Sequence, residues 1–550
     1  MDAIIDGDVA SSHLSNWHSI NWKATSCAVS RMQARIAKAA KDKQWRRVTR
    51  LQKLLVRSTA AKATAVRRVT ENQGRRTPGV DRATWSTPAA KWNAINSLQR
   101  KGYKAKPLRR IHIPKARGGT RPLGIPTMKD RAMQALYLFA LDPVAEAYGD
   151  IHSYGFRSFR STADAAAHLK TCLSTKTSSR WVMEGDIKGC FDNISHDWLM
   201  KHVPIDRHVL SQWLKAGFME DRKLFPTDAG TPQGGIISPV LANIVLDGLG
   251  RLIDALPRRN KCNFVRYADD FVITGASAEI LERKVKPIVV KFLAERGLTL
   301  SESKTKITHM DEGFDFLGWN FRKFGNLLLR RPSKQNTNAF MAKIRSQLRL
   351  LRGSTQDDVL HVLNPIIRGW GMYHQVVNAS EPFARLDHLI HHAVWCWAKR
   401  RHPTKGLRWI KRRYFRRDKS RDWIFGVGKH TLMRLSSLKV GEYIKVRSDV
   451  SPYDPKDESY FNQRLQYRMK RSLTGKRKLL WLWTKQEAKC ACCGRKLTST
   501  SWHIHHKVFR VYGGSDRLSN LVLLHTTCHE QLHARARLRL SPPPIEEGGL

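Results

Sequence analysis

The chain has 550 residues, and its 98 Lys and Arg against 46 Asp and Glu give a formal net charge of +52. That length predicts about three to five domains, and 41% hydrophobic residues with 17 Trp exclude a disordered basic tail protein. The sequence has no apolar run long enough for a membrane span, and its acidic, polar N-terminus excludes an ordinary secretory signal. So large a positive charge predicts a polyphosphate partner, above all nucleic acid, with an anionic membrane surface as the weaker alternative.

In chain order, the sequence changes character several times. Residues 29–70 carry Lys and Arg at helical spacing beside an apolar side, which indicates one or two basic helices. Residues 104–320 mix short β-rich runs with helical segments, an α+β pattern with hairpins. Residues 333–401 are helical again, with three apolar stripes: Phe340, Ile344, Leu348 and Leu351; Leu360, Leu363, Ile367, Trp370 and Tyr373; Phe383, Leu386, Ile390, Val394 and Trp397.

The stretch 399–417 is the most basic part of the chain. Ten of its nineteen residues are Lys or Arg, none is acidic, and Trp409, Tyr414 and Phe415 lie among them. Aromatic residues between basic ones suit contact with a nucleic-acid backbone and stacking on unpaired bases. The alternative is a solvated basic face.

Two adjacent carboxylates, Asp269 and Asp270, lie between runs of apolar β-formers, which predicts a hairpin with both acids at its turn. Like charges side by side repel, so such a pair usually needs a cation. Two Mg²⁺ ions about 3.5–4 Å apart can activate a 3′-hydroxyl and stabilise a pyrophosphate leaving group. The third carboxylate that such a site needs is Asp186, after a predicted strand over 181–185, with Asp192 as its competitor. The alternative for the pair is a solvated hairpin turn.

Three further segments suit a nucleotide substrate. Residues 231–239, TPQGGIISP, form a Gly/Pro loop whose backbone can approach a ligand closely. Lys115 and Arg121 flank a flexible Gly-Gly pair, as a loop around a triphosphate requires. Lys304 follows a Ser-rich turn.

Taken together, these segments resemble the reverse transcriptases encoded by bacterial group II introns, which also act as maturases. The resemblance runs from about residue 30 to residue 540 and is carried by IPKARGGTRPLGIPTMKDRAMQ, SYGFRS, EGDIKGCFDNI, GTPQGGIISPVLAN, RYADDF, SESKTKI and FDFLGWNF, followed by RGWGMYH of the thumb. Seven polymerase motifs in the family's order are far more specific than any one of them.

The resemblance implies a role for each matching residue. Asp186, Asp269 and Asp270 would coordinate the catalytic Mg²⁺ pair. Phe191 would screen the sugar 2′ position and so favour dNTP over rNTP; without the motif order it would be read as a core aromatic. Gln233 and Gly234 would line the nucleotide pocket. Lys115 and Arg121 would hold the incoming triphosphate, and Lys304 would assist the pyrophosphate.

The last 61 residues hold four of the nine Cys, together with several His. Cys490 and Cys493 form a C-x-x-C pair, and His525 and Cys528 form an H-x-x-C pair farther on, which predicts a tetrahedral structural Zn²⁺ site. Cys492 is left over, although it could replace either neighbouring Cys. The five remaining Cys are scattered, as buried thiols in a reduced cytosol would be.

The residues between these two pairs resemble the HNH (ββα-metal) nuclease motif. By that pattern His506 is the general base and Asn520 orients it, while His505 and His529, joined by His533, hold one divalent metal, expected to be Mg²⁺. The chain has His525 where Cys is common and His505 where Asp is common, and both remain metal-ligand types. The alternative is a zinc module that only binds DNA or stabilises the terminus.

The expected fold is a multidomain α+β right-hand polymerase: fingers and palm with an antiparallel palm sheet, a helical thumb, a basic helical DNA-binding segment and a ββα-metal (HNH) module with a zinc site. The expected boundaries are 15–105 for a basic RNA-binding extension, 106–325 for fingers and palm, 326–402 for the maturase thumb, 403–475 for the DNA-binding segment, 480–540 for the HNH module and 541–550 for a disordered tail.

The resemblance implies an RNA-directed DNA polymerase, splicing maturase and site-specific endonuclease that acts in retrohoming by target-primed reverse transcription. Its partners would be the intron RNA in a ribonucleoprotein, target DNA, an RNA template with a DNA primer, and dNTPs, with no membrane, in the bacterial cytoplasm at the nucleoid. The alternatives are a reverse transcriptase of a retron or diversity-generating element, a splicing-only maturase and a standalone homing endonuclease. RGWGMYH and the HNH motif disfavour a retron or diversity-generating element. The three Asp disfavour a splicing-only maturase, and the polymerase motifs disfavour a standalone homing endonuclease.

Overall fold

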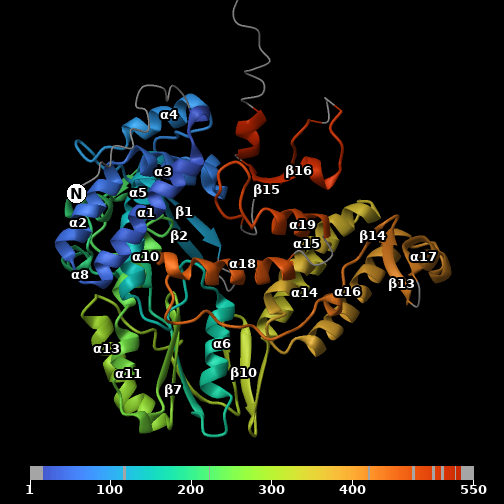
Figure 1. Ribbon diagram of the computed structural model, residues 1–550. Coiled ribbons are helices and arrows are strands. Elements are labelled where there is room, and N and C mark those ends of the chain that lie inside the picture. The colour runs from blue at the N-terminus through green and yellow to red at the C-terminus, as the bar shows by residue number, and fades with distance from the viewer. Residues whose placement is uncertain are drawn as a thin grey trace, which may run out of the picture.

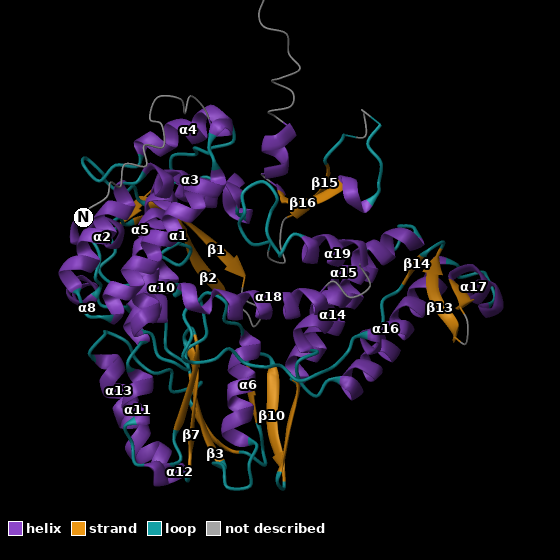
Figure 2. Ribbon diagram, viewed as in Figure 1, coloured by secondary structure: helices purple, strands orange, loops and turns teal. Residues whose placement is uncertain are grey.

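The computed structural model describes residues 17–114, 119–221, 223–418, 421–472, 477–497, 502–509, 513–526 and 528–533. The predictions for Lys115 and for the tail at 541–550 lie outside these residues. The protein has a mixed α/β multidomain architecture (Figure 2). Among the described helices, none combines the length and apolar character that crossing a membrane requires.

The basic helices predicted over 29–70 are present and pack on a long buried helix. The side chains of Asn21 and Ser58 cap the first and third of them by accepting hydrogen bonds from the N–H groups of Ala24 and Ala61. The apolar sides of all three contact α5, whose interior positions are buried almost throughout. The helices of this region are α1 (Trp22–Lys41), α2 (Trp45–Arg57), α3 (Thr59–Glu71), α4 (Pro88–Ser97) and α5 (Met128–Tyr148).

A small sheet next to these helices has the order β2-β1-β4-β5. Strands β1 (Leu108–Pro114) and β2 (Thr120–Ile125) form an antiparallel hairpin. β4 (Phe218–Glu220) runs parallel to β1, and β5 (Lys223–Phe225) completes the edge.

A second sheet, with the order β6-β7-β3-β8, is antiparallel throughout. Its strands are β3 (Trp181–Gly185), β6 (Asn263–Tyr267), β7 (Asp270–Gly275) and β8 (Lys306–His309). Alternate side chains enter two different hydrophobic cores: Phe264 and Ile273 belong to one, and Val265 and Val272 to the other. We call it the palm sheet. The surrounding helices are α6 (Thr162–Leu173), α7 (Cys190–Asn193), α8 (His196–His202), α9 (Arg207–Leu214), α10 (Ser238–Leu246), α11 (Leu249–Asp254), α12 (Ala278–Ile280) and α13 (Lys286–Ala294).

The thumb region consists of three long helices that follow a three-stranded sheet. The predicted apolar stripes are buried over most of their length, which confirms the helical interpretation. Tyr373 is the main departure, because it is 38% exposed and donates its hydroxyl to the Leu317 carbonyl at 2.8 Å. The elements are β9 (Phe314–Phe316), β10 (Trp319–Phe324), β11 (Leu327–Pro332), α14 (Lys334–Leu350), α15 (Gln356–His374) and α16 (Ser380–Arg401).

The prediction of a helical segment over 403–475 is wrong for residues 415–431. After α17 (Leu407–Tyr414) the chain forms an antiparallel sheet of β12 (Phe415–Asp418), β13 (Arg421–Val427) and β14 (His430–Thr431). Tyr414 at the end of α17 and the strand residues Phe415 and Phe425 are buried, and Tyr414 and Phe425 contact Trp397 of the thumb. Aromatic packing of this kind favours strands for Phe415 and Phe425. Tyr414 and Phe415 are therefore not available for base stacking, whereas Trp409 stays 40% exposed.

Residues 435–457, which we call the strap, run from the thumb back toward the middle of the molecule (Figure 1). At the thumb end, Asp387 accepts the N–H groups of Leu435 and Ser436 at 2.7 and 2.9 Å. At the palm end, the buried carboxylate of Asp164 on α6 accepts the Val446 N–H at 2.7 Å and the Tyr443 hydroxyl at 3.1 Å. The strap then leads into α18 (Glu458–Ser472), α19 (Arg477–Lys485) and the hairpin of β15 (Trp502–His506) and β16 (Leu521–His525).

Candidate active sites

The palm sheet brings three carboxylates to one end. Tyr267 pairs with Asp270, so Ala268 and Asp269 form the turn between β6 and β7. Gly185 of β3 pairs with Phe271 of β7, and continuing this antiparallel register places Asp186 opposite Asp270. The predicted hairpin is thus present, and its neighbour on the sheet is the strand that leads into Asp186.

The pKa values of Asp269 and Asp270 are raised, in part because the carboxylates of this group lie close to one another. Burial, followed by Asp269 and Asp186, raises the pKa of Asp270 to about 6, against the opposing effect of Lys304. Burial and Asp186 also raise the pKa of Asp269. Hard oxygen donors that repel one another fit a divalent cation such as Mg²⁺.

The turn that contains Ala268 and Asp269 is contacted by Gly155 and Arg266, which we did not single out in the sequence. Ala268 has a positive φ of 60°, and Gly155 of the SYGFRS motif packs so closely that an added Cβ would lie 2.2 Å from the Ala268 nitrogen. The fully buried Arg266 donates to the Ala268 carbonyl at 3.2 Å and forms an ion pair with Asp247. Gly155 and Arg266 therefore set the position of the turn that carries Asp269.

Replacing Gly155 by alanine is expected to lower primer extension by about 10²-fold, because the new methyl group would push the acidic turn out of place. The matched control is Gly353→Ala, since a Cβ at Gly353 meets open space. Steady-state primer extension together with thermal unfolding tests this. Equal activity of the two variants would contradict the close-packing argument.

The basic residues expected at the triphosphate are placed as follows. Lys304 donates to the Asp186 carboxylate at 2.8 Å and is therefore at the acidic site. Arg121 is exposed on β2, and its charge opposes the raised pKa of Asp269. Lys115 lies outside the described residues. Lys304 and Arg121 thus approach the carboxylates from two separate elements.

The loop at 231–235 packs against α7 and β2 beside the acidic site. Gln233 donates its side chain to Asp192 at 3.4 Å and accepts the Gly124 N–H at 2.7 Å through its backbone carbonyl. Gly234 has a φ of 111°, where a Cβ would lie 2.8 Å from the Gly124 oxygen. Asp192 therefore interacts with the loop, whereas Asp186 directly continues the strand beside the acidic turn.

Phe191 lies on α7 at the edge of this loop, and its carbonyl accepts the Thr231 N–H at 2.6 Å. Its ring makes an edge contact with the 49% exposed Phe156, 6.3 Å between centroids. Phe156 follows Gly155 in SYGFRS and was also not singled out in the sequence. This short motif therefore supports both the acidic turn and the aromatic at position 191.

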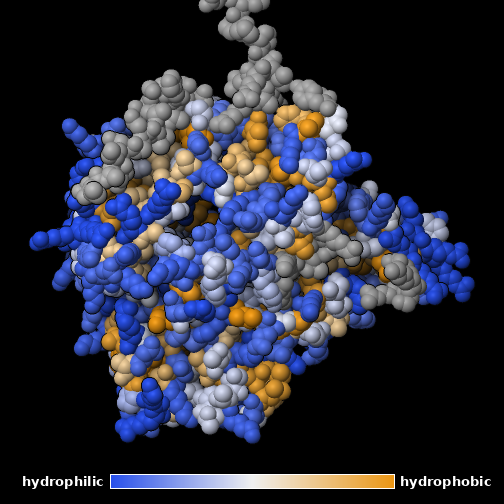
Figure 3. Space-filling model, viewed as in Figure 1, coloured by the Kyte–Doolittle hydropathy of each residue, from blue (hydrophilic) through white to orange (hydrophobic). Residues whose placement is uncertain are grey.

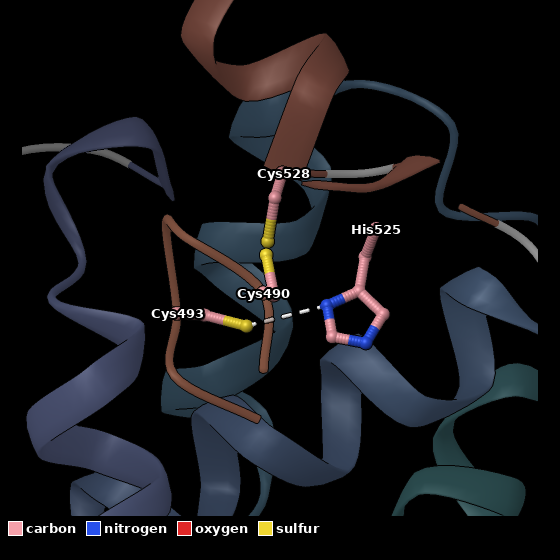
Figure 4. A group of neighbouring side chains, drawn as sticks. All are labelled: Cys490, Cys493, His525 and Cys528. Carbon is pink, nitrogen blue, oxygen red and sulfur yellow. Dashed lines mark hydrogen bonds between the residues drawn. The ribbon is translucent and has the colours of Figure 1, made fainter. Parts of the chain in front are cut away.

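The four expected zinc ligands converge, and their side chains point toward one another (Figure 4). The donor atoms of Cys490, Cys493, His525 and Cys528 all lie within 4.8 Å of one another, and the three Cys are buried. Cys493 and His525 are 3.3 Å apart, between Sγ and Nδ1. Cys492 is outside this group. Three thiolates and one imidazole in a closed, buried arrangement fit a structural Zn²⁺ ion.

A second cluster in the same module consists of three histidines. Donor atoms of His505 on β15 and of His529 and His533, four residues apart in the following helical segment, lie within 4.8 Å of one another. The buried Nδ1 of His505 has no hydrogen-bond partner among the described residues. Burial and then the neighbouring His lower the pKa of His505 to about 4, which keeps the imidazole in its neutral, metal-binding form. These donors fit a divalent metal.

The polar group found at His506 is Asp516, which we did not predict. The Nε2 atom of His506 lies 2.7 Å from the Asp516 carboxylate. Asn520 holds the loop after β15 instead: it accepts the Val508 N–H at 2.8 Å and donates to the Val508 and Ser515 carbonyls. These hydrogen bonds tie Asn520 to the loop that directly follows His506, and its expected role in orienting His506 stays a prediction.

Comparison with protein families gives four matches along the chain. Residues 17–98 match the N-terminal domain of reverse transcriptase, and residues 113–321 match reverse transcriptase (RNA-dependent DNA polymerase). Residues 337–415 match the group II intron maturase-specific domain, and residues 490–535 match HNH endonuclease.

Individual proteins are also similar to this chain. The protein YkfC of Escherichia coli K12 is 32% identical over 336 residues, which cover 53% of this chain and 87% of YkfC. The group II intron-encoded protein LtrA of Lactococcus lactis is 29% identical over 369 residues, which cover 54% of this chain and 61% of LtrA. Among solved structures, the apo telomerase of Candida tropicalis is 13% identical with a TM-score of 0.35, covering 57% of this chain and 65% of that one.

The domain matches and the similarity to YkfC agree with the arrangement of the palm carboxylates and of the two Cys/His clusters. A reverse transcriptase domain, a maturase domain and an HNH endonuclease domain follow one another in a single chain. The chain therefore belongs to the group II intron-encoded proteins, as a multifunctional reverse transcriptase and maturase with a C-terminal HNH endonuclease domain.

Proposed function

We propose that this protein nicks a DNA strand with its HNH module and uses the new 3′ end to prime copying of its intron RNA at Asp186, Asp269 and Asp270. The observation that carries the proposal is the register of the palm sheet, which brings Asp186 beside the acidic turn. The two activities complement each other, because a polymerase needs the primer end that a nuclease produces.

In the polymerase site, a Mg²⁺ pair, when bound, would activate the primer 3′-hydroxyl and stabilise the leaving pyrophosphate. The three carboxylates would hold it. Lys304 and Arg121, with Lys115, would neutralise the triphosphate, and Gln233 and Gly234 would line the nucleotide pocket. Phe191, braced by Phe156, would exclude a ribose 2′-hydroxyl.

In the nuclease site, a divalent metal, expected to be Mg²⁺, would stabilise charge on the scissile phosphate. His505, His529 and His533 would hold it. His506 would take a proton from the attacking water, and the Asp516 carboxylate would orient the imidazole and stabilise its protonated form. Asn520 would support the loop that places His506.

The remaining regions would bind the nucleic acids, with the domain boundaries expected from the sequence. The extension over 15–105 would bind intron RNA and, with the thumb over 326–402, promote splicing as a ribonucleoprotein. The basic segment over 403–475 would bind target DNA. The template would be RNA paired to the DNA primer, the substrates would be dNTPs, and Zn²⁺ would stabilise the HNH module. The reaction would take place on nucleoid DNA in the bacterial cytoplasm.

The proposal is tested by incubating the protein–intron RNA complex with end-labelled target DNA, Mg²⁺ and dNTPs. We expect cDNA covalently joined to the 3′ end of the nicked strand, seen as a labelled strand longer than the target. Nicking with unattached cDNA would contradict target priming, and it would favour a reverse transcriptase of another retroelement type.

Binding of intron RNA is expected to weaken steeply with salt. Within the extension proposed to bind this RNA, residues 29–70 carry Lys and Arg at helical spacing, and hydrophilic side chains project at the left edge of the face in Figure 3, where α2 lies. A protein that neutralises several phosphates loses about 10³-fold in affinity between 50 and 200 mM salt. Filter-binding titrations at four salt concentrations measure this slope, and a flat response would contradict electrostatic binding.

A further inference from the structure

The zinc group of the HNH module touches a helix from the opposite end of the sequence. Arg67 in the middle of α3 donates a guanidinium N–H to the Cys528 sulfur at 3.1 Å, across 461 residues of sequence. Arg67 is only 2% exposed. An exposed arginine could make such a contact by chance. Removing the Arg67 guanidinium from water is costly, so its burial against a metal-binding thiol indicates a stabilising contact.

The groups around Arg67 come from both sides of the contact. On α3, Glu71 forms an ion pair with Arg67. Arg495, two residues after Cys493, forms an ion pair with the same carboxylate at 3.4 Å. The guanidinium also lies 4.6 Å from the ring centroid of Trp22 on α1. Buried residues of the zinc module, Cys528 among them, belong to the same hydrophobic core as the N-terminal helices. The contact is therefore part of a packed interface.

The charges of Arg67, Arg495, Glu71 and the zinc group balance with the metal in place, an argument that rests on the proposed zinc ligands. A Zn²⁺ ion with three thiolates and one neutral imidazole has a net charge of minus one. Together with Glu71 it matches the two positive charges of Arg67 and Arg495. Without Zn²⁺, the buried Arg67 guanidinium loses the zinc-bound thiolate that it contacts, which is costly in a dry interface.

We propose that Arg67 is the docking residue that fastens the HNH module to the polymerase's N-terminal helices, and that it does so by binding the zinc-bound Cys528 thiolate. Zinc then has two functions in this chain: it stabilises the module and it completes the interface with α3. Loss of the metal releases the nuclease from the polymerase. The nuclease is thereby held in a defined place relative to the palm only in the zinc-loaded protein.

The test compares Arg67→Met with Arg68→Met in the full-length protein. Arg68 is the next residue of α3 and is exposed, so its variant removes the same charge from the same helix. Zinc transfer to a colorimetric chelator is measured together with hydrogen exchange of residues 490–497 and 521–525. We expect Arg67→Met to release zinc about tenfold faster and to lose protection in both segments, and Arg68→Met to resemble wild type. Equal zinc release in both variants would overturn the proposal.

A second measurement needs no substitution. Chelation of zinc from the wild-type protein is expected to increase hydrogen exchange in α3, which contributes no metal ligand. Unchanged exchange in α3 after complete zinc removal would also overturn the proposal. If the purified wild-type protein holds no zinc at this site, the proposed ligand set itself fails, and that outcome is distinguished by the metal content measured before either experiment.

Discussion

Replacing Asp269 by alanine is expected to lower primer extension on an RNA template by about 10³-fold or more, equivalent to about 4 kcal/mol of transition-state stabilisation. Asp269 lies in the turn between β6 and β7, beside Asp270 and the strand that leads into Asp186. Its removal would leave the metal pair without one of its ligands. Single-nucleotide incorporation, measured under single-turnover conditions, separates this loss from slower product release.

The matched control for this substitution is Asp311→Asn. Asp311 follows β8 at the far end of the palm sheet, where Trp181 pairs with His309, and its carboxylate is half exposed. It should extend primers at the wild-type rate. Folding of both variants is checked by thermal unfolding. Wild-type extension by Asp269→Ala would contradict the assignment of the acidic turn as the catalytic centre.

Replacing His506 by alanine is expected to abolish strand nicking, with a loss of about 10²–10⁴-fold, because no other group would take the proton from the attacking water. Asp516→Asn should nick about tenfold more slowly than wild type, since it retains a hydrogen-bond acceptor beside His506 but loses the negative charge. Both variants should extend a primer supplied on pre-nicked DNA as well as wild type does.

The control for the nuclease is His208→Ala, which removes an exposed histidine from α9. Nicking and extension are measured on the same preparations. Loss of both activities in His506→Ala would indicate a folding defect rather than a missing base. Retention of nicking would contradict the role of His506, and Asp516→Asn equal to wild type would contradict the orienting role of its carboxylate.

Local patterns predicted the parts of the site that are local in structure. Apolar β-formers around Asp269 and Asp270 predicted the hairpin, because a two-residue turn needs only its flanking strands. The spacing of Cys490 and Cys493 predicted one half of the zinc group, and helical spacing predicted the buried faces of the thumb. Each of these features depends on neighbours within a few residues or on a repeating period.

The remaining features depend on partners that are distant in the sequence. Gly155 gives no local signal for its contact with Ala268, and Arg67 gives none for Cys528. Asp516 lies in a loop, where neither helical nor strand periodicity applies, so no pattern in the sequence indicated its contact with His506. The sheet of β12–β14 was taken for a basic helix because its charges dominate the sequence, whereas packing of Phe425 on the thumb decides its conformation.

The strap has a mechanical consequence for the polymerase. Its anchors, Asp387 on the thumb and Asp164 on the palm, are joined by the short stretch from Ser436 to Tyr443. Fully stretched, eight residues span at most about 29 Å, to which the Tyr443 side chain adds its own length. While both anchors hold, the chain therefore limits how far the thumb can move away from α6. In the proposed polymerase, the strap would thereby limit the width of a template–primer duplex that could lie between the thumb and α6.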